Sequence, residues 1–300
     1  MSSPAVEALL ALQLPDGSFP SVVLSGQMRS TDYNGFATAT VLRLLRHLPG
    51  SAALEVLRER GLAFLACCRS ALVPGAFAFW PDGGRPDWAR SIPADVDDTA
   101  MMLSLLVRAG RVTRAGAVRN VCRVLLTARV YASEGTPRPP WIAPGSFHTW
   151  LDTGAALDLG RSPNVVDCCV NANVVALLAQ LEATHLPGHD EAIRTITSGV
   201  EWAGRDAARL ESLSPFYPSI RALAEALEHA IDCGAGALRP ALARLRTAFA
   251  SAPPNDDAIC RSAYGGTTWH CEAVVLARAI AAEHEVRAAR GAMLVAHSAG

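Results

Sequence analysis

Three aspartates lie close together in the segment 92–100, which has the sequence IPADVDDTA and leads directly into an apolar stretch. Aspartate is common at the cap and first turn of a helix, where backbone N–H groups are unpaired, so the segment also suits a plain helix start. Asp95, Asp97 and Asp98 are more carboxylates than a cap needs. Because like charges raise the pKa of a carboxyl group, we expect at least one to keep a proton at neutral pH and to act as an acid.

The string DVDDTA over 95–100 resembles the DxDDTA motif of squalene–hopene cyclases and related class II terpene cyclases. In that family the middle aspartate of the motif donates a proton to a terminal alkene or an epoxide. The resemblance therefore implies that Asp97 is the catalytic acid and that Asp95 and Asp98 tune it. It also implies a class II-type terpene cyclase that cyclises a lipophilic isoprenoid substrate through carbocations. Because these cyclases use two barrels and 300 residues make only one, we expect a short isoprenoid.

A second segment, 166–175, has the sequence VDCCVNANVV and begins another apolar stretch. It resembles the place where these cyclases set a His, or in some diterpene cyclases an Asn, against the catalytic aspartate, and by position that residue is Asn173. An amide N–H donated to the carbonyl oxygen of the acid would orient its O–H toward the substrate. Asn171 is assigned to substrate binding. Capping of a helix start remains the alternative for both asparagines.

Apolar residues recur at i, i+3 and i+4 along most of the chain, which is the spacing of amphipathic helices. Helices are predicted over 4–13, 33–48, 52–72, 97–110, 112–130, 167–184, 189–205, 216–232, 236–250, 266–283 and 285–297. Largely apolar helices alternate with helices that carry arginines and acids on one face. This pattern predicts an all-α protein, a single (α/α) barrel of five to six inner-outer helix pairs over 1–300, the architecture that the resemblance also implies.

Aromatic residues gather at the predicted starts of the inner helices, which such a barrel would place on one rim. Aromatic faces stabilise positive charge without acting as nucleophiles, so we expect these side chains to bind the substrate, although pinning loops to the barrel is an equal alternative. The aromatic residues assigned to substrate binding are Tyr33, Phe36, Trp88, Trp141, Phe147, Trp150, Phe216, Tyr217, Tyr264 and Trp269. The long irregular stretch 131–163, which contains His148, is interpreted as a lid over this rim.

The composition excludes several classes of function. All 27 basic residues are arginine, which excludes a Schiff-base lysine and a P-loop lysine, and the net charge of −1 without basic runs argues against nucleic-acid binding. No apolar run is long enough to span a membrane, and no signal peptide is evident. The eight cysteines are interpreted as free thiols in a reducing cytoplasm. A single barrel must also close its cavity. A homodimer or a partner protein is an alternative to the lid for this closure. Peripheral contact with a membrane would suit a lipophilic substrate.

Two other functions compete with cyclisation. A barrel related to the β subunits of protein prenyltransferases would bind zinc or depend on a partner chain, and the matching ligand set is Asp167, Cys169 and His270, although a helix over 216–232 separates these segments. A carbohydrate-active α/α barrel would pair Asp97 with another carboxylate. Protonation itself needs no cofactor. A diphosphate substrate would bring Mg²⁺, and the arginines near the predicted rim are Arg90, Arg138 and Arg161.

Overall fold

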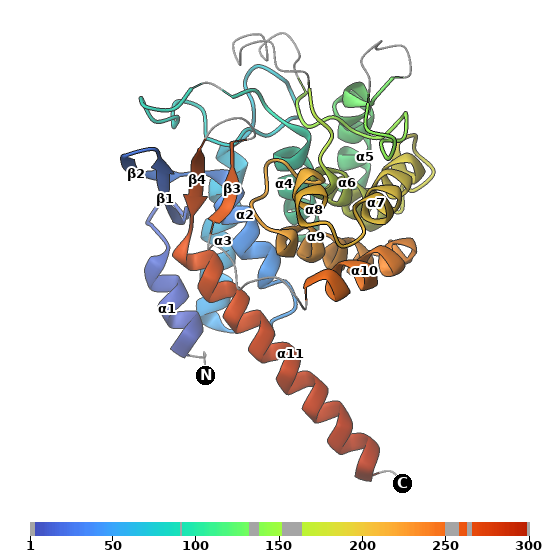
Figure 1. Ribbon diagram of the computed structural model, residues 1–300. Coiled ribbons are helices and arrows are strands. Elements are labelled where there is room, and N and C mark those ends of the chain that lie inside the picture. Colours follow the sequence, from blue (N-terminus) through green and yellow to red (C-terminus); the bar gives the residue numbers. More distant parts are fainter. Residues whose placement is uncertain are drawn as a thin grey trace.

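A computed structural model describes residues 4–90, 92–131, 138–151, 164–249, 258–262 and 266–298. Helices make up most of the described chain (Figure 1). The α-helices are α1 (Pro4–Leu12), α2 (Gly35–Leu44), α3 (Ala52–Cys67), α4 (Val96–Arg108), α5 (Arg114–Arg123), α6 (Cys168–Gln180), α7 (His189–Ala203), α8 (Ala207–Ser212), α9 (Ile220–Asp232), α10 (Arg239–Phe249) and α11 (Glu272–Ser298). Short 3₁₀ turns, η1 (Leu125–Ala128) and η3 (Gly236–Leu238), follow α5 and α9.

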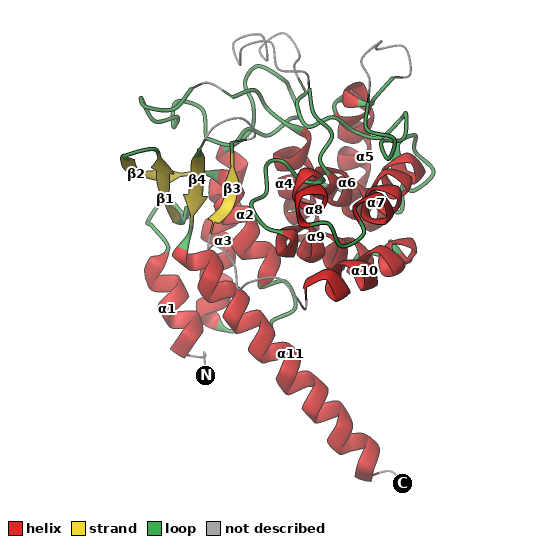
Figure 2. Ribbon diagram, viewed as in Figure 1, coloured by secondary structure: helices red, strands yellow, loops and turns green. Residues whose placement is uncertain are grey.

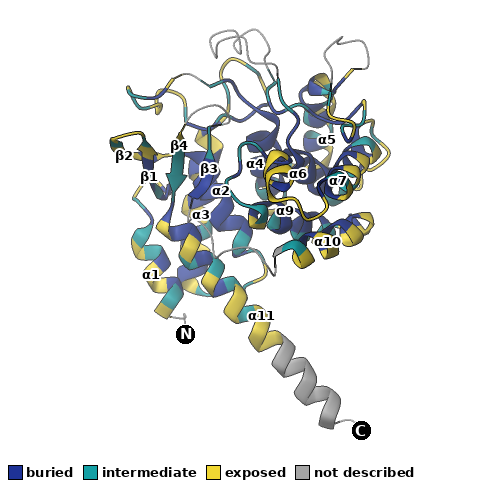
Figure 3. Cartoon of the chain, viewed as in Figure 1, coloured by how far each residue is buried: buried dark blue, intermediate teal, exposed yellow. Residues whose placement is uncertain are grey.

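The most deeply buried helices lie next to one another in chain order. Helix α4 packs between α2 and α6, and α6 packs in turn against α9. Most residues of α4 and α6 are buried, whereas α5 and α10 have exposed faces (Figure 3). Helix α11 packs against α2 and is joined to α9 by Arg278, whose guanidinium donates to both carboxylate oxygens of Glu225 at 2.9 and 3.0 Å.

A four-stranded antiparallel sheet lies beside these helices, and it shows that the predicted all-α barrel is wrong (Figure 2). The strands are β1 (Pro20–Ser25), β2 (Met28–Tyr33), β3 (Ala258–Arg261) and β4 (Thr267–His270), in the spatial order β2-β1-β4-β3. The described chain is therefore mixed α/β. The helices expected to begin at residues 33 and 266 begin instead at Gly35 and Glu272, because Tyr33 ends β2 and residues 267–270 form β4. The last two expected helices form the single helix α11.

The physical reason for this error is that the sheet joins two distant parts of the chain. Strand β1 pairs with β4 from Val22 opposite His270 to Ser25 opposite Thr267. Each strand has only four to six residues, and so short an apolar run cannot be distinguished from part of a helix by periodicity. The β1–β2 hairpin has a local signal in its two-residue turn, Gly26-Gln27, where Gly26 takes φ +57°.

The predicted lid over 131–163 is described only in part. Residues 132–137 and 152–163 lie outside the described residues, so the lid remains a prediction. The described part, 138–151, runs along the ends of α4 and α6, where Val96 donates its backbone N–H to the carbonyl of Thr149 at 2.8 Å. Within the described helices, none has the length and apolar character needed to cross a membrane.

Candidate active site

The acidic cluster lies at the N-terminus of α4. Asp95 is the N-cap residue, and its carboxylate accepts a hydrogen bond from the backbone N–H of Asp98 at 2.7 Å. Isolated β-bridges link Asp95 to Phe77 on one side and to Trp150 on the other, so the cap is held by two loops. Asp97 and Asp98 follow in the first turn, and all three carboxyl groups are buried.

Asp97 is held by side chains from two other helical regions. The amide Nδ2 of Asn173, in the first turns of α6, donates to Asp97 Oδ1 at 2.7 Å. The hydroxyl of Tyr217, in the segment before α9, donates a hydrogen bond to Asp97 Oδ2. Arg43 of α2 is buried and donates to Asn173 Oδ1 at 2.9 Å, which fixes the amide with its Nδ2 toward the acid. Each Asp97 oxygen thus has one defined donor.

Burial raises the pKa of Asp97, while the hydrogen bonds from Asn173 and Tyr217 and the positive charge of Arg43 lower it in part. Burial also raises the pKa of Tyr217 well above its usual range, with the charge of Asp97 acting in the same direction. Tyr217 is therefore a neutral phenol that donates its proton to a hydrogen bond at physiological pH. The arrangement suits a buried carboxylic acid whose conjugate base would be stabilised at once by two donors.

The two neighbouring carboxyl groups also retain protons more strongly than usual. Burial raises the pKa of Asp95 to about 7, and the charge of Asp97 adds to the effect. Burial, followed by the charges of Asp95 and Asp97, raises the pKa of Asp98 well above its usual range. The pKa values of Asp95 and Asp98 are thus raised more by desolvation than by the repulsion between carboxylates on which the sequence expectation was based.

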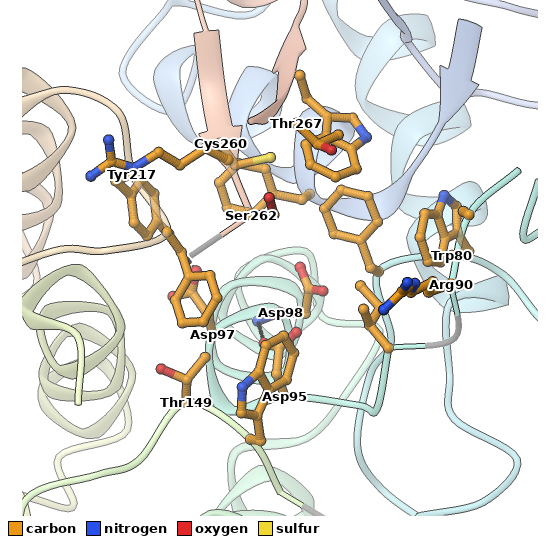
Figure 4. A pocket seen from close by; sticks show the side chains of 18 of the residues that line it. Trp80, Arg90, Asp95, Asp97, Asp98, Thr149, Tyr217, Cys260, Ser262 and Thr267 are labelled. Atoms are coloured by element: carbon orange, nitrogen blue, oxygen red, sulfur yellow. Dashed lines mark hydrogen bonds between the residues drawn. The ribbon is translucent and has the colours of Figure 1, made fainter. Parts of the chain in front are cut away.

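A cavity of about 590 Å³ opens beside the three aspartates (Figure 4). This volume lies within the usual range for small-molecule sites, roughly 300 to 1,000 Å³. Its walls come from the N-terminus of α4, the start of α2, the segment before α9 and the strands β1, β3 and β4. The lining is mainly apolar and aromatic. Six of the aromatic residues assigned to substrate binding line it, namely Phe36, Trp88, Trp150, Phe216, Tyr217 and Trp269.

Four other residues assigned to substrate binding are described but do not line the cavity. Tyr33 is exposed on β2, and Trp141 packs against Trp202 with ring centroids 6.2 Å apart. Phe147 is fully buried, and Asn171 hydrogen-bonds to both its backbone N–H (3.0 Å) and its carbonyl (2.9 Å). These contacts hold loops to the helices. The remaining member of the set, Tyr264, lies outside the described residues.

The set assigned to substrate binding from the sequence left out several residues of the cavity wall, most importantly Phe79 and also Trp80, which is among the aromatics near the predicted rim. The Phe79 ring contacts Trp80 and Trp269 edge-on, at centroid distances of 4.9 and 5.6 Å, and is stacked with Phe36 at 6.3 Å. Trp80 belongs to an aromatic-rich run, Phe77 to Trp80, which was a local signal. The other unassigned lining residues are Ser25, Met28, Ala89, Ile92, Thr149, Val170, Cys260, Arg261, Ser262 and Thr267.

The candidate zinc ligands have other partners in the structure. Asp167 caps α6, where Oδ1 accepts from the backbone N–H groups of Cys169 and Val170 and Oδ2 accepts from that of Phe216 at 3.2 Å. The Cys169 thiol contacts the Ser214 hydroxyl, and His270 is on β4. Burial raises the pKa of Cys169 well above its usual range, with Asp167 adding to the effect. In the described part of the chain, no three His, Cys, Asp or Glu side chains are grouped to hold a metal ion.

The arginines considered for a diphosphate differ in position. Arg90 is exposed and lines the cavity, so it can meet a charged group at the entrance. Arg138 donates to the carbonyl of Tyr131 and does not line the cavity. Arg161 lies outside the described residues. His148, in the described part of the expected lid, is half-buried and also does not line the cavity.

No family model and no curated protein matches this sequence. Among solved structures, a protein from Actinoplanes shares the fold with a TM-score of 0.53 at 19% identity, over 85% of this chain and 66% of that one. This chain thus spans slightly less than two thirds of the Actinoplanes protein. The type II terpene cyclase MstE from Scytonema is similar at 17% identity and a TM-score of 0.41, over 81% of this chain and 75% of that one.

A variant of MstE in complex with geranylgeranyl dihydroxybenzoate, its substrate, is similar at 14% identity and a TM-score of 0.42, over 92% of each chain. These values describe a loose likeness in fold, and nothing about the reaction of this chain follows from them. The resemblance to squalene–hopene cyclases is therefore one of motif, and membership of that family is not shown.

Proposed function

We propose that this protein is a protonation-initiated terpene cyclase in which Asp97 donates a proton to an alkene or epoxide of a short isoprenoid. The observation that carries the proposal is the position of Asp97, a buried acid held by Asn173 and Tyr217 at the wall of an aromatic cavity. A polar substrate would need more hydrogen-bonding groups in this wall, whereas an isoprenoid chain needs an apolar, shaped surface.

In the first step, the π electrons of the substrate alkene take the proton from Asp97, and the O–H bond electrons remain on the carboxylate. We assign the proton to Oδ2, with Oδ1 as the carbonyl oxygen that accepts from Asn173 and Oδ2 as a hydroxyl oxygen that also accepts from Tyr217. Once Oδ2 is negative, the hydrogen bond from Tyr217 strengthens, since bonds to charged acceptors are roughly twice as strong as neutral ones. Donors that stabilise the carboxylate more than the acid lower the barrier to transfer.

The cation formed in this way reacts with further double bonds of the same chain, and each ring closure moves the positive charge along the cavity. Faces of the lining Trp, Phe and Tyr residues attract this charge but form no bond with it. Loss of a proton, or addition of water followed by loss of a proton, ends the sequence. The overall reaction is an isomerisation or a hydration, and Asp97 regains one proton from solvent in each cycle.

Protonation requires no metal, and we propose no step that uses one. If the substrate carries a diphosphate, Mg²⁺ would accompany that group, and Arg90 at the cavity would contact it as a further cation. An isoprenoid alcohol or another neutral derivative would react through the same acid without Mg²⁺.

Incubation of the EDTA-treated protein with C10 to C20 prenyl alcohols and diphosphates tests the proposal. We expect cyclised products from at least one chain length, and loss of these products in Asp97→Asn. Stoichiometric zinc together with no product from any isoprenoid would contradict the proposal and favour a zinc-dependent or partner-dependent barrel like the prenyltransferase β subunits. Hydrolysis of a glycoside instead would favour a carbohydrate-active protein.

A further inference from the structure

Asp32, on β2, is a fully buried carboxylate at the sheet side of the cavity. Its two oxygens accept four hydrogen bonds. Oδ1 accepts from the indole Nε1 of Trp80 at 2.7 Å and from the backbone N–H of Tyr33 at 2.8 Å. Oδ2 accepts from the indole Nε1 of Trp269 at 2.7 Å and from the amide Nδ2 of Asn34 at 3.0 Å. Since every partner is a donor, the carboxyl group is used only as an acceptor, as in its ionised form.

The two indoles that Asp32 binds are part of the cavity wall, whereas Asp32 itself is not. Trp80 comes from the loop after α3 and Trp269 from β4, and both rings contact the ring of Phe79 between them. The carboxylate therefore connects three separate segments of chain and fixes the rotation of both indoles. Asn34 extends this connection to the start of α2, because its Oδ1 caps the helix through the N–H of Ala37 at 2.8 Å.

The charge of Asp32 has no cationic partner among these four donors, which are two indoles, one amide and one backbone N–H. Burial of an ionised carboxylate is costly and is tolerated only when hydrogen bonds satisfy it. Neutral donors satisfy the lone pairs but leave the negative charge in place. An indole N–H bound to an anion also polarises its ring, which increases the electron density of the face that a cation meets.

We propose that Asp32 is a positioning residue that holds Trp80 and Trp269 against the cavity and makes their faces a cation-binding surface. The inference rests on the proposed function, because the cation it stabilises is the one that forms after Asp97 gives up its proton. Charge would then move from the acid at α4 toward the sheet, where a second carboxyl group, held by four donors, lies behind the aromatic wall.

The test compares two ligands that differ only in charge: a C15 prenyl chain ending in a trimethylammonium group, and its neutral isostere with carbon in place of nitrogen. Calorimetric titration gives the dissociation constant of each. We expect the wild-type protein to bind the cation at least about tenfold more tightly than the isostere, as cation–π contact at a desolvated site provides. In Asp32→Asn, where the amide nitrogen cannot accept from an indole, we expect this ratio to fall to about one to three.

Because Asp32 is buried, Trp80→Phe and Trp269→Phe provide a second route that does not depend on the folding of Asp32→Asn. Each keeps an aromatic face but removes one indole N–H, and we expect each to lower the cation preference about threefold. Trp202→Phe is the matched control, because Trp202 packs on Trp141 away from the cavity lining and should leave the ratio unchanged. The inference would be overturned if the substitutions weakened the binding of both ligands equally. An unchanged ratio of dissociation constants in Asp32→Asn, Trp80→Phe and Trp269→Phe would overturn it too.

A spectroscopic readout separates positioning from general stability. In ¹H–¹⁵N spectra of the wild-type protein we expect two indole N–H signals at unusually low field, because both donate to a carboxylate. Each signal should vanish in the corresponding Trp→Phe variant, and the remaining one should persist. Normal shifts for both would contradict the hydrogen bonds. A folded protein that prefers the cationic ligand but forms no product would contradict the proposed cyclase activity and leave the role of Asp32 intact. A protein that forms product, but whose Asp32, Trp80 and Trp269 variants keep the wild-type ratio of dissociation constants, would contradict the role of Asp32 and leave the cyclase activity intact.

Discussion

Two buried carboxyl groups differ in their surroundings, Asp97 at the start of α4 on the cavity wall (Figure 4) and Asp32 on β2 behind the indoles of Trp80 and Trp269. Asp97 lies among other acids, and burial raises its pKa against the opposing effect of Asn173 and Tyr217. Asp32 lies among four N–H donors, and none of these four partners is an acid. The same side chain is thus an acid open to the cavity in one place and only an acceptor of hydrogen bonds in the other.

The comparison indicates that the number and kind of hydrogen-bond donors around a buried carboxyl group decide its chemistry. Both groups are removed from water, and desolvation alone favours the neutral acid. Two indoles, an amide and a backbone N–H fill every acceptor position of Asp32, whereas Asp97 has one donor for each oxygen and remains open to the cavity. The predictions below test this contrast in order of decreasing effect.

Replacement of the acid should have the largest effect. We expect Asp97→Asn to lower the rate of cyclisation by about 10³-fold or more, since an amide has no proton to donate at this acidity. Gas chromatography of the products measures the loss. Asp82→Asn, which changes an exposed aspartate outside the cavity lining, is the control and should keep full activity. Comparable activity in both variants would remove Asp97 from the acid role.

Removal of the Tyr217 hydroxyl should have the next largest effect. Its hydrogen bond lowers the pKa of Asp97 and stabilises the carboxylate formed on transfer. We expect Tyr217→Phe to slow turnover roughly 10- to 100-fold, because Asp97 becomes a weaker acid. The same change keeps Asp97 protonated to higher pH, so the alkaline fall of the pH–rate profile should move upward. A slower enzyme with an unmoved profile would show that Tyr217 acts only through packing.

Asp95 offers a test through stability rather than activity. Its pKa of about 7 in the folded protein lies above the usual 3.8, so between these values the unfolded chain ionises while the folded state keeps the proton. Stability from this group is therefore complete below pH 4 and is lost as the pH rises toward 7, by up to about 1.4 kcal/mol per pH unit. We expect the free energy of unfolding of Asp95→Asn to exceed that of the wild type by a margin that grows from about pH 4 to pH 7.

Urea denaturation at successive pH values measures that margin. Asparagine is also a good N-cap, so the variant should keep the hydrogen bond from the N–H of Asp98. The exposed Asp82→Asn serves again as the control, and its difference from wild type should stay constant with pH. A constant difference in Asp95→Asn as well would mean that the acid cluster is not desolvated as described.

Arg90 should give the smallest effect, since it is exposed. If the substrate is a diphosphate, we expect Arg90→Gln to raise KM about three- to tenfold and to leave kcat nearly unchanged. The KM for the matching prenyl alcohol should not change. An equal increase in KM for both substrates would place Arg90 against the isoprenoid chain rather than a charged end.

The acid wall could be predicted from the sequence to a much greater extent than the sheet wall. The aspartate cluster is local, and its motif and the later Asn173 point to the same helix starts that the structure brings together at 2.7 Å. Tyr217 was assigned to the cavity, but its contact with Asp97 depends on how the segment before α9 approaches α4, which no local pattern encodes.

The sheet wall could not be predicted because it depends on pairing between the two ends of the described chain. Asp32 and Trp269 are 237 positions apart and meet only when β1 pairs with both β2 and β4. The polar run Thr31 to Asn34 lies at the start of the helix predicted over 33–48, and Asn34 does cap α2. Nothing in that run shows that the carboxylate before the cap would bind two distant indoles.

The central claim is that the reaction begins with a proton from Asp97, and the most direct measurement is product analysis after turnover in D₂O. Because Asp97 is refilled from solvent, the account predicts, for an alkene substrate, one non-exchangeable deuterium bound to carbon in each product molecule, at the position of the protonated alkene. Asp97→Asn should form no labelled product. A product from a simple alkene substrate without deuterium, or equal labelling by Asp97→Asn, would contradict it.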